Sequence, residues 1–169
     1  LKAIISRHET LRTVFKEENG KPVQIVQEKV VLDLEKVIIP DSMGNTQNNN
    51  VQAVVNKITA QPFNLEKGPL MKCHLISMKP DDYVLIINMH HIISDGWSKG
   101  LLANELMLLY GSMLTEKSFV LPELKIQYRD YVAWQENFAQ KPEFQKELSY
   151  WKSVLEGAAP VLELPLDFT

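Results

Sequence analysis

The sequence predicts an α/β fold, with a mixed, mostly antiparallel sheet and helices packed on it. Two pairs of β-branched, apolar runs are each joined by a short turn signal, which favours antiparallel hairpins. Between and after these pairs, apolar residues recur at helical spacing. With 169 residues, 45% of them hydrophobic, the chain is long enough for one packed domain of ordinary size.

The first part of the chain predicts a helical start followed by a hairpin. Residues 11–17 and 22–27 are strand-like and flank Asn19-Gly20, a strong signal for a two-residue turn. Residues 32–39 predict a further strand, and the polar, Asn-rich stretch 40–50 predicts a loop.

The rest of the chain predicts one more hairpin and four helices. Val51, Val54, Val55 and Ile58 fall on one helical face, and Gln61-Pro62 ends that helix. The remaining predicted elements are two strands at 70–78 and 83–91 and three helices at 98–114, 126–139 and 143–157. Large aromatic residues in the last helices are interpreted as packing anchors, namely Trp134, Tyr150 and Trp151.

Two histidines and a carboxylate follow the second hairpin directly. His90 and His91 come at the carboxyl end of a buried strand, and successive strand side chains point to opposite faces, so the two rings should diverge. Ser94 or Asp95 can cap the helix that begins near Trp97. A purely structural interpretation makes His91 a buried, hydrogen-bonded core histidine and Asp95 only a helix cap. Gly96 favours a functional interpretation, because glycine permits close approach of a ligand.

Metal ligation and several partner classes are disfavoured. Beyond His90 and His91 the chain has only His8, His74 and the single Cys73, without the spacing of a zinc site. Cys73 lies in a strand-like run and is expected in the core. The net charge is −3 without a basic stripe, and no apolar run reaches the roughly 18 residues of a membrane helix, so neither nucleic acid nor membrane is expected as a partner. One cysteine and no signal-like start favour the cytoplasm.

Three segments of the chain match motifs of one known family. Residues 89–98 read Met-His-His-Ile-Ile-Ser-Asp-Gly-Trp-Ser, which matches that family's His-His-x-x-x-Asp-Gly followed by Trp-Ser. Residues 7–15 match Arg-His-x-x-Leu-Arg-Thr-x-Phe, and residues 128–134 match Tyr-x-Asp-Tyr-x-x-Trp. The chain therefore resembles condensation domains of nonribosomal peptide synthetases, within the chloramphenicol acetyltransferase-like superfamily. The resemblance implies a chloramphenicol acetyltransferase-like lobe. It also implies that residues 1–169 are a partial condensation domain: the N-terminal lobe without its first strand and helix, and with the second lobe absent.

The resemblance also implies roles for individual residues. In the family, a carrier-bound aminoacyl amine attacks a carrier-bound acyl or peptidyl thioester and forms an amide. His91 is then the catalytic histidine, either as general base or as an orienting and electrostatic group, and His90 is structural. Gly96 keeps the channel open. Asp95 is expected to be an organiser held by an arginine, with Arg7 favoured over Arg12. Trp97 and Ser98 complete the motif as structural support.

The resemblance names partners as well. No cofactor is expected to bind the chain directly, because the phosphopantetheine arms belong to upstream and downstream peptidyl carrier domains. A neighbouring adenylation domain and the second lobe are further expected partners, and without that lobe the fragment is expected to be inactive. Three alternatives stay open: an epimerization domain, a coenzyme A-dependent acyltransferase, and a catalytically dead scaffold that docks carriers.

Overall fold

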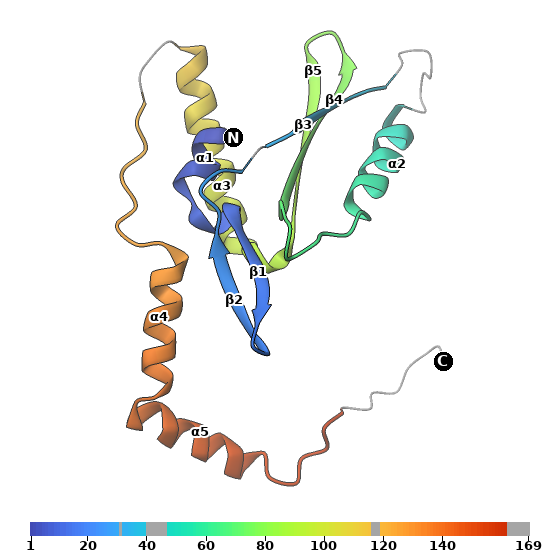
Figure 1. The fold of residues 1–169 in the computed structure, drawn as a ribbon. Helices are drawn as coiled ribbons and strands as arrows, with labels where there is room; N and C mark the ends of the chain where they lie inside the picture. Colours follow the sequence, from blue (N-terminus) through green and yellow to red (C-terminus); the bar gives the residue numbers. More distant parts are fainter. Residues whose placement is uncertain (31, 40–46, 116–118, 162–169) are drawn as a thin grey trace. The chain divides into compact units, whose positions relative to one another are not determined.

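The computed structural model describes residues 1–30, 32–39, 47–115 and 119–161 (Figure 1). The chain divides into two compact units, Leu1–Gln127 and Tyr128–Thr169. The predicted histidine loop and the amino-terminal motif both belong to the first unit.

The first unit begins with a short helix and a hairpin (Figure 1). Helix α1 (Lys2–Arg7) and the 3-10 turn η1 (Glu9–Arg12) precede strands β1 (Thr13–Glu18) and β2 (Lys21–Val26), which pair antiparallel. Asn19 and Gly20 have φ angles of 55° and 76°, the left-handed conformation that a tight hairpin turn requires. The predicted hairpin is therefore confirmed, although the first strand starts at Thr13 instead of residue 11.

A second, three-stranded sheet supports the histidine loop. Its strands are β3 (Leu34–Ile38), β4 (Met71–Lys79) and β5 (Asp82–Met89), in the order β3-β4-β5. Strand β3 runs parallel to β4, whereas β4 and β5 form an antiparallel hairpin. One parallel pair beside antiparallel hairpins confirms the predicted mixed, mostly antiparallel character.

Helix α2 (Gln47–Thr59) starts earlier than the sequence indicates. Residues 47–50 were predicted as loop but are helical, which corrects that part of the prediction; residues 40–46 lie outside the described part of the chain. Asparagine has a modest helix propensity, so a short Asn run can extend a helix whose apolar stripe follows it. The helix packs beside β5, where the Asn88 side-chain amide donates to the Ile58 carbonyl at 3.4 Å.

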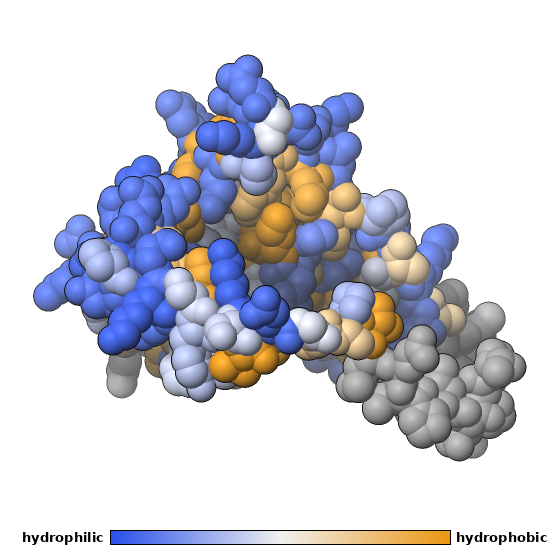
Figure 2. All heavy atoms as spheres, turned by 90° about the horizontal axis from the view of Figure 1, so that it is seen from below, coloured by the Kyte–Doolittle hydropathy of each residue, from blue (hydrophilic) through white to orange (hydrophobic). Residues whose placement is uncertain are grey.

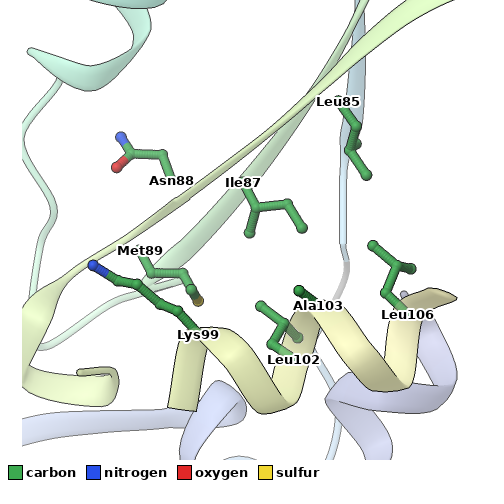
Figure 3. Close-up of a pocket in the computed structure, with 8 residues that line it drawn as sticks. All are labelled: Leu85, Ile87, Asn88, Met89, Lys99, Leu102, Ala103 and Leu106. Carbon is green, nitrogen blue, oxygen red and sulfur yellow. The ribbon is translucent and has the colours of Figure 1, made fainter. Parts of the chain in front are cut away.

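Helix α3 (Gly96–Leu114) borders the opposite face of β5 (Figure 3), and the core forms among α1, α3 and the sheet. Cys73 is 1% exposed and belongs to this core, as predicted. Each fully buried aliphatic side chain contributes about 1.5–3 kcal/mol, so the cluster holds α1 and α3 to the sheet. Its buried members are Ile4, Ile5, Leu11, Leu70, Met71, Cys73, Ile93 and Leu102.

The second unit consists of helices α4 (Tyr128–Ala139) and α5 (Pro142–Val154). Along α4, Trp134 stacks on Phe138 with ring centroids 5.4 Å apart and an interplanar angle of 9°. Trp134, Tyr150 and Trp151 nevertheless stay 55%, 62% and 56% exposed, so they are only partial packing anchors. No helix in the described ranges is long and apolar enough to cross a membrane.

Candidate functional site

The histidine loop connects β5 to α3 with little free backbone. The strand ends at Met89, and the His90 N–H donates to the Leu70 carbonyl at 3.0 Å. His91 begins the 3-10 turn η3 (His91–Ile93), and α3 starts three residues later at Gly96. Buried Ile93 anchors the turn in the core, so the loop holds its side chains on a rigid base.

His90 has a structural placement. Its Nδ1 accepts a hydrogen bond from the Ile92 N–H at 3.0 Å, which leaves Nε2 to hold the proton of the neutral ring. The ring also meets Phe63 edge-on, with centroids 5.9 Å apart. Both contacts fix the ring where the 3-10 turn begins.

His91 is exposed, and its ring has no hydrogen-bond partner among the described residues. Burial in the core is therefore the wrong interpretation for this side chain. An exposed imidazole can accept a proton from a bound group or donate one to it.

Asp95 is the helix cap of α3. Its Oδ1 accepts from the Ser98 N–H at 2.7 Å, and the Ser98 hydroxyl accepts from the Asp95 N–H at 2.7 Å, which completes a capping box. The hydrogen bond from the Ser98 N–H lowers the pKa of Asp95 most, the Ser98 hydroxyl lowers it further, and the positive form of His91 adds a smaller effect. The carboxylate is thus ionised close to His91.

The predicted ion pair between Asp95 and an arginine is wrong in this structure. Arg7 Nε instead donates to Glu105 Oε1 at 3.0 Å, and Arg12 pairs with Glu9 at 3.5 Å. Asp95 is exposed and has its cap partners, so no buried charge requires a guanidinium. The sequence identified the arginines but not Glu105, which lies on an ordinary stretch of helix.

The residues after Asp95 differ in their surroundings. A Cβ atom added to Gly96 would meet nothing within 4 Å, so open space lies beside the loop. Ser98 takes part in the capping box at the start of α3. Trp97 is 80% exposed and has no ring contact within the described ranges, so its expected supporting role stays a prediction.

A groove of about 440 Å³ runs between β5 and α3, the two elements that the histidine loop connects (Figure 3). Figure 3 shows Ile87 and Met89 directed toward α3 while Asn88 points to the other side of the strand. Sequence reasoning missed this groove, although alternate residues of β5 and helix-spaced residues of α3 form it. Its lining residues are Leu85, Ile87, Asn88, Met89, Lys99, Leu102, Ala103 and Leu106.

Neither the thiol of Cys73 nor a cluster of metal ligands adds reactive groups within the described residues. Burial raises the pKa of the Cys73 thiol to about 11, which keeps it protonated and a poor nucleophile near neutral pH. In the part of the chain that the structure describes, no three His, Cys, Asp or Glu residues are grouped as metal ligands.

Fold and site together define an α/β lobe in which an exposed histidine follows a strand that borders an apolar groove. The family model described as the condensation domain matches residues 1–169, and the chain belongs to this family.

Relatives and solved structures agree with this family. Tyrocidine synthase 3 of Brevibacillus parabrevis is 40% identical over 166 residues, which are 98% of this chain and 2% of that protein. Gramicidin S synthase 2 of Aneurinibacillus migulanus is 38% identical over 99% of this chain and 3% of its own length. The crystal structure of the epimerization domain from the third module of tyrocidine synthetase B matches with a TM-score of 0.80 and 25% identity, over 99% of this chain and 38% of that one. The chain thus spans a small part of each relative.

Proposed function

We propose that this chain is the histidine-bearing lobe of a domain that joins a carrier-bound acyl or peptidyl thioester to a carrier-bound aminoacyl amine. The observation that supports this most is the exposure of His91 at the start of the turn between β5 and α3. The ionised Asp95 lies near it, and open space lies beside Gly96.

His91 has two physically admissible roles in amide formation. As a neutral imidazole it accepts the proton of the attacking amine, or it orients the amine and stabilises the charge that develops as the new bond forms. General base help of this kind is typically worth about 10²- to 10⁴-fold in rate.

The groove between β5 and α3 suits the acyl portion of a substrate. Its walls are mostly aliphatic, so a carbon chain would displace water there at a gain of roughly 25 cal/mol per Å² of apolar surface. Lys99 places a cation in the same lining, which can attract an anionic group of an incoming carrier arm. The phosphopantetheine arms that would deliver both substrates belong to the carrier domains.

The proposed partners follow from the share of the fold that this chain represents. It covers 38% of the epimerization-domain chain that it resembles. We therefore assign the opposite wall of the channel to a second lobe, and the substrates to upstream and downstream carriers loaded by a neighbouring adenylation domain. Such an assembly would work in the cytoplasm.

An epimerization domain is the alternative that one observation favours, namely the solved neighbour of that activity. It would use the same histidine to move a proton at the α-carbon of an aminoacyl group. The sequence favours condensation, because Trp97-Ser98 after the glycine and the amino-terminal motif at residues 7–15 both match condensation domains.

A single-turnover assay in the longest natural polypeptide containing this chain tests the proposal. Both carriers are loaded, and the condensed product is followed by mass spectrometry for wild type, His91→Ala and the control Asn104→Ala, at an exposed position of α3. We expect His91→Ala to slow product formation by about 10²- to 10⁴-fold with the carriers still loaded, and the control to behave as wild type. Unchanged product in His91→Ala would overturn the assignment, and inversion of the acceptor without condensation would establish epimerization instead.

A further inference from the structure

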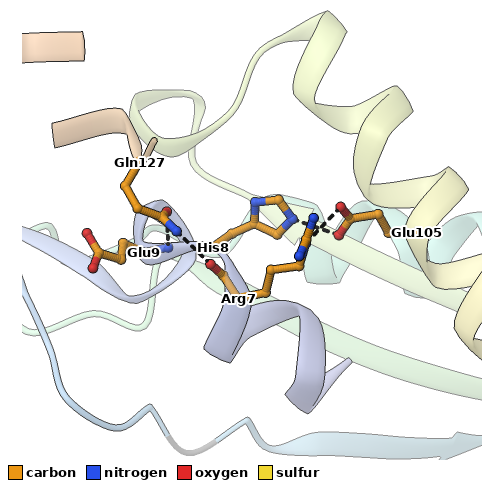
Figure 4. A network of polar contacts seen from close by, with 5 residues as sticks. All are labelled: Arg7, His8, Glu9, Glu105 and Gln127. Carbon is orange, nitrogen blue, oxygen red and sulfur yellow. Dashed lines mark hydrogen bonds and ion pairs between the residues drawn. The ribbon is translucent and has the colours of Figure 1, made fainter. Parts of the chain in front are cut away.

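The Glu105 carboxylate on α3 contacts two side chains, Arg7 and His8, from the corner where α1 meets η1. Glu105 Oε1 accepts from Arg7 Nε at 3.0 Å, and Glu105 Oε2 lies 2.7 Å from His8 Nε2 (Figure 4). Because an ionised carboxylate only accepts, the Nε2 of His8 must hold a proton. The corner between α1 and η1 is thus joined to the middle of α3 by two directed bonds.

A side-chain amide holds the same corner from the other side. Gln127 donates from Nε2 to the Arg7 carbonyl at 3.0 Å and accepts from the Glu9 N–H at 3.1 Å. Its two bonds fix the backbone on both sides of His8, and this holds Arg7 and His8 in position to contact Glu105. Figure 4 shows the amide and the carboxylate on opposite sides of this corner.

The contacts of Glu105 are largely removed from solvent. The side chains of Arg7, His8 and Glu105 are only 17%, 26% and 14% exposed. Ion pairs at such sites are screened less than surface pairs, and loss of one partner leaves the other charged and poorly solvated. A carboxylate bound at both oxygens also has one preferred orientation, unlike the apolar contacts around it.

We propose that Glu105 is a positioning residue: through Arg7 and His8 it sets the place of α3 on α1, and with it the place of the histidine loop that begins this helix. The bonds inside the loop, such as those between Asp95 and Ser98, are local and shape it without joining it to α1. Glu105 lies nine residues from Gly96, about 14 Å along a rigid helix, so a shift at one end moves the other.

Hydrogen exchange tests this positioning without any assay of activity. In the longest natural polypeptide containing this chain, Glu105→Gln keeps the side chain's size but removes its charge, and Asn104→Ala is the matched control on the same helix. We expect amides of residues 90–100 to exchange about tenfold faster in Glu105→Gln, with the β1–β2 hairpin and the control unchanged. Wild-type exchange at residues 90–100 in Glu105→Gln would overturn the proposal, as would an equal increase across the hairpin.

Kinetics add a second measurement, which rests on the proposed function. We expect Glu105→Gln to lower kcat by about 10- to 100-fold with KM for the carriers unchanged, because small displacements of a reacting group cost rate rather than binding. His8→Gln should retain most activity, since its amide can supply a donor where Nε2 lies, whereas His8→Leu should not. Equal activity of the two His8 variants would count against positioning. If the wild type forms no amide, the proposed function fails while the exchange result still decides the role of Glu105.

A triple variant distinguishes positioning by Glu105 from a contribution to stability alone. Replacing Arg7, His8 and Glu105 together by Met, Leu and Leu removes every charge and can restore stability, since buried ion pairs are often replaceable by apolar side chains. We expect stability to recover while kcat stays low. Full recovery of both kcat and stability would show that Arg7, His8 and Glu105 act only through packing.

Discussion

At the scale of single residues, Gly96 matters because it has no side chain at the start of α3, directly after the histidine loop. A Cβ there would meet no atom within 4 Å, and its backbone is that of an ordinary helix start. We expect Gly96→Leu to leave the melting temperature within about 2 °C of wild type, because it creates no clash, and to lower product formation by more than about tenfold by filling the approach to His91. Thermal unfolding and the single-turnover assay measure both.

Gly111→Leu is the matched control for this prediction. Gly111 lies on the same helix, far from the loop, and its Cβ also meets nothing within 4 Å. It should keep full activity. A fully active Gly96→Leu protein would show that substrates do not pass this side of the loop.

Asp95 is a second residue whose role the structure changes. As a capping residue it can be replaced by Asn, which caps helices about equally well, but not by Ala. We expect Asp95→Asn to fold with nearly wild-type stability and Asp95→Ala to melt at a lower temperature. An Asn variant that fails to fold would restore the arginine-pair hypothesis, since only a buried ion pair would make the charge indispensable.

The pH dependence of the same variants gives an independent check. Hydrogen bonds from Ser98 hold the pKa of Asp95 below its ordinary value of 3.8. A carboxyl whose folded pKa is lowered stabilises the protein above its unfolded pKa, and this stabilisation is lost as the pH falls through the folded pKa. The difference in melting temperature between wild type and Asp95→Asn should therefore be constant near neutral pH and vanish in acid. A difference that grows in acid would contradict this role.

At the scale of elements, the segment between α2 and β4 is held against β1 by its backbone. The Phe15 N–H donates to the Leu65 carbonyl at 2.8 Å. Gly68 has a φ of +63°, and a Cβ there would lie 3.0 Å from Cγ1 of Val14, a core residue that is 2% exposed. We expect Gly68→Ala to lower the free energy of unfolding by about 1–3 kcal/mol, measured by urea denaturation.

Gly100→Ala should change stability in the opposite direction. Gly100 lies within α3, and its Cβ would meet open space, so Ala should stabilise by about 0.5–1 kcal/mol through helix propensity alone. Equal effects of the two substitutions would show that the strain at Gly68 is absent.

Local patterns predicted most elements, whereas long-range pairing escaped them. Asn19-Gly20 and the apolar spacing of α3 are signals within one element, and both led to the observed structure. The partner of Arg7 lies 98 residues away, and nothing in the sequence near Glu105 distinguishes it from an exposed helix residue. His74 is similar: it is 3% exposed and lies 3.2 Å from Glu35, a pair that only the register of β3 on β4 creates.

In the candidate site, too, the local features could be predicted from the sequence and the long-range contacts could not. The order of His90, His91, Asp95 and Gly96 along the chain was enough to predict a strand, a tight loop and a capped helix. The divergence of the two rings stays a prediction. Choosing between a helix cap and an ion pair for Asp95 required the position of every arginine, which depends on how α1 packs. The expected roles of His91 and Gly96 in catalysis stay predictions.

At the scale of the whole molecule, many large apolar side chains of the described residues are exposed. On α3 alone, Met107, Met113 and Leu114 are 67%, 79% and 68% exposed. Figure 2 shows apolar residues at the surface among hydrophilic ones. Exposed apolar surface of this kind is typical of a face that another protein segment covers.

The 169-residue chain prepared by itself would expose the apolar side chains of α3. If a second lobe covers the apolar side chains of α3, the chain without it should bind a hydrophobic dye and associate as its concentration rises, because burial of apolar surface stabilises contacts between copies. Sedimentation velocity across a concentration series measures this. Met107→Lys combined with Met113→Lys should shift the population toward monomer without lowering the melting temperature, since neither side chain is buried. The matched control, Lys16→Met with Lys79→Met on the strands, leaves the α3 surface unchanged and should leave association at least as strong as in wild type. A chain that stays monomeric and binds no dye would show that α3 needs no cover, and the assignment of the opposite channel wall to a second lobe would lose its support from this surface.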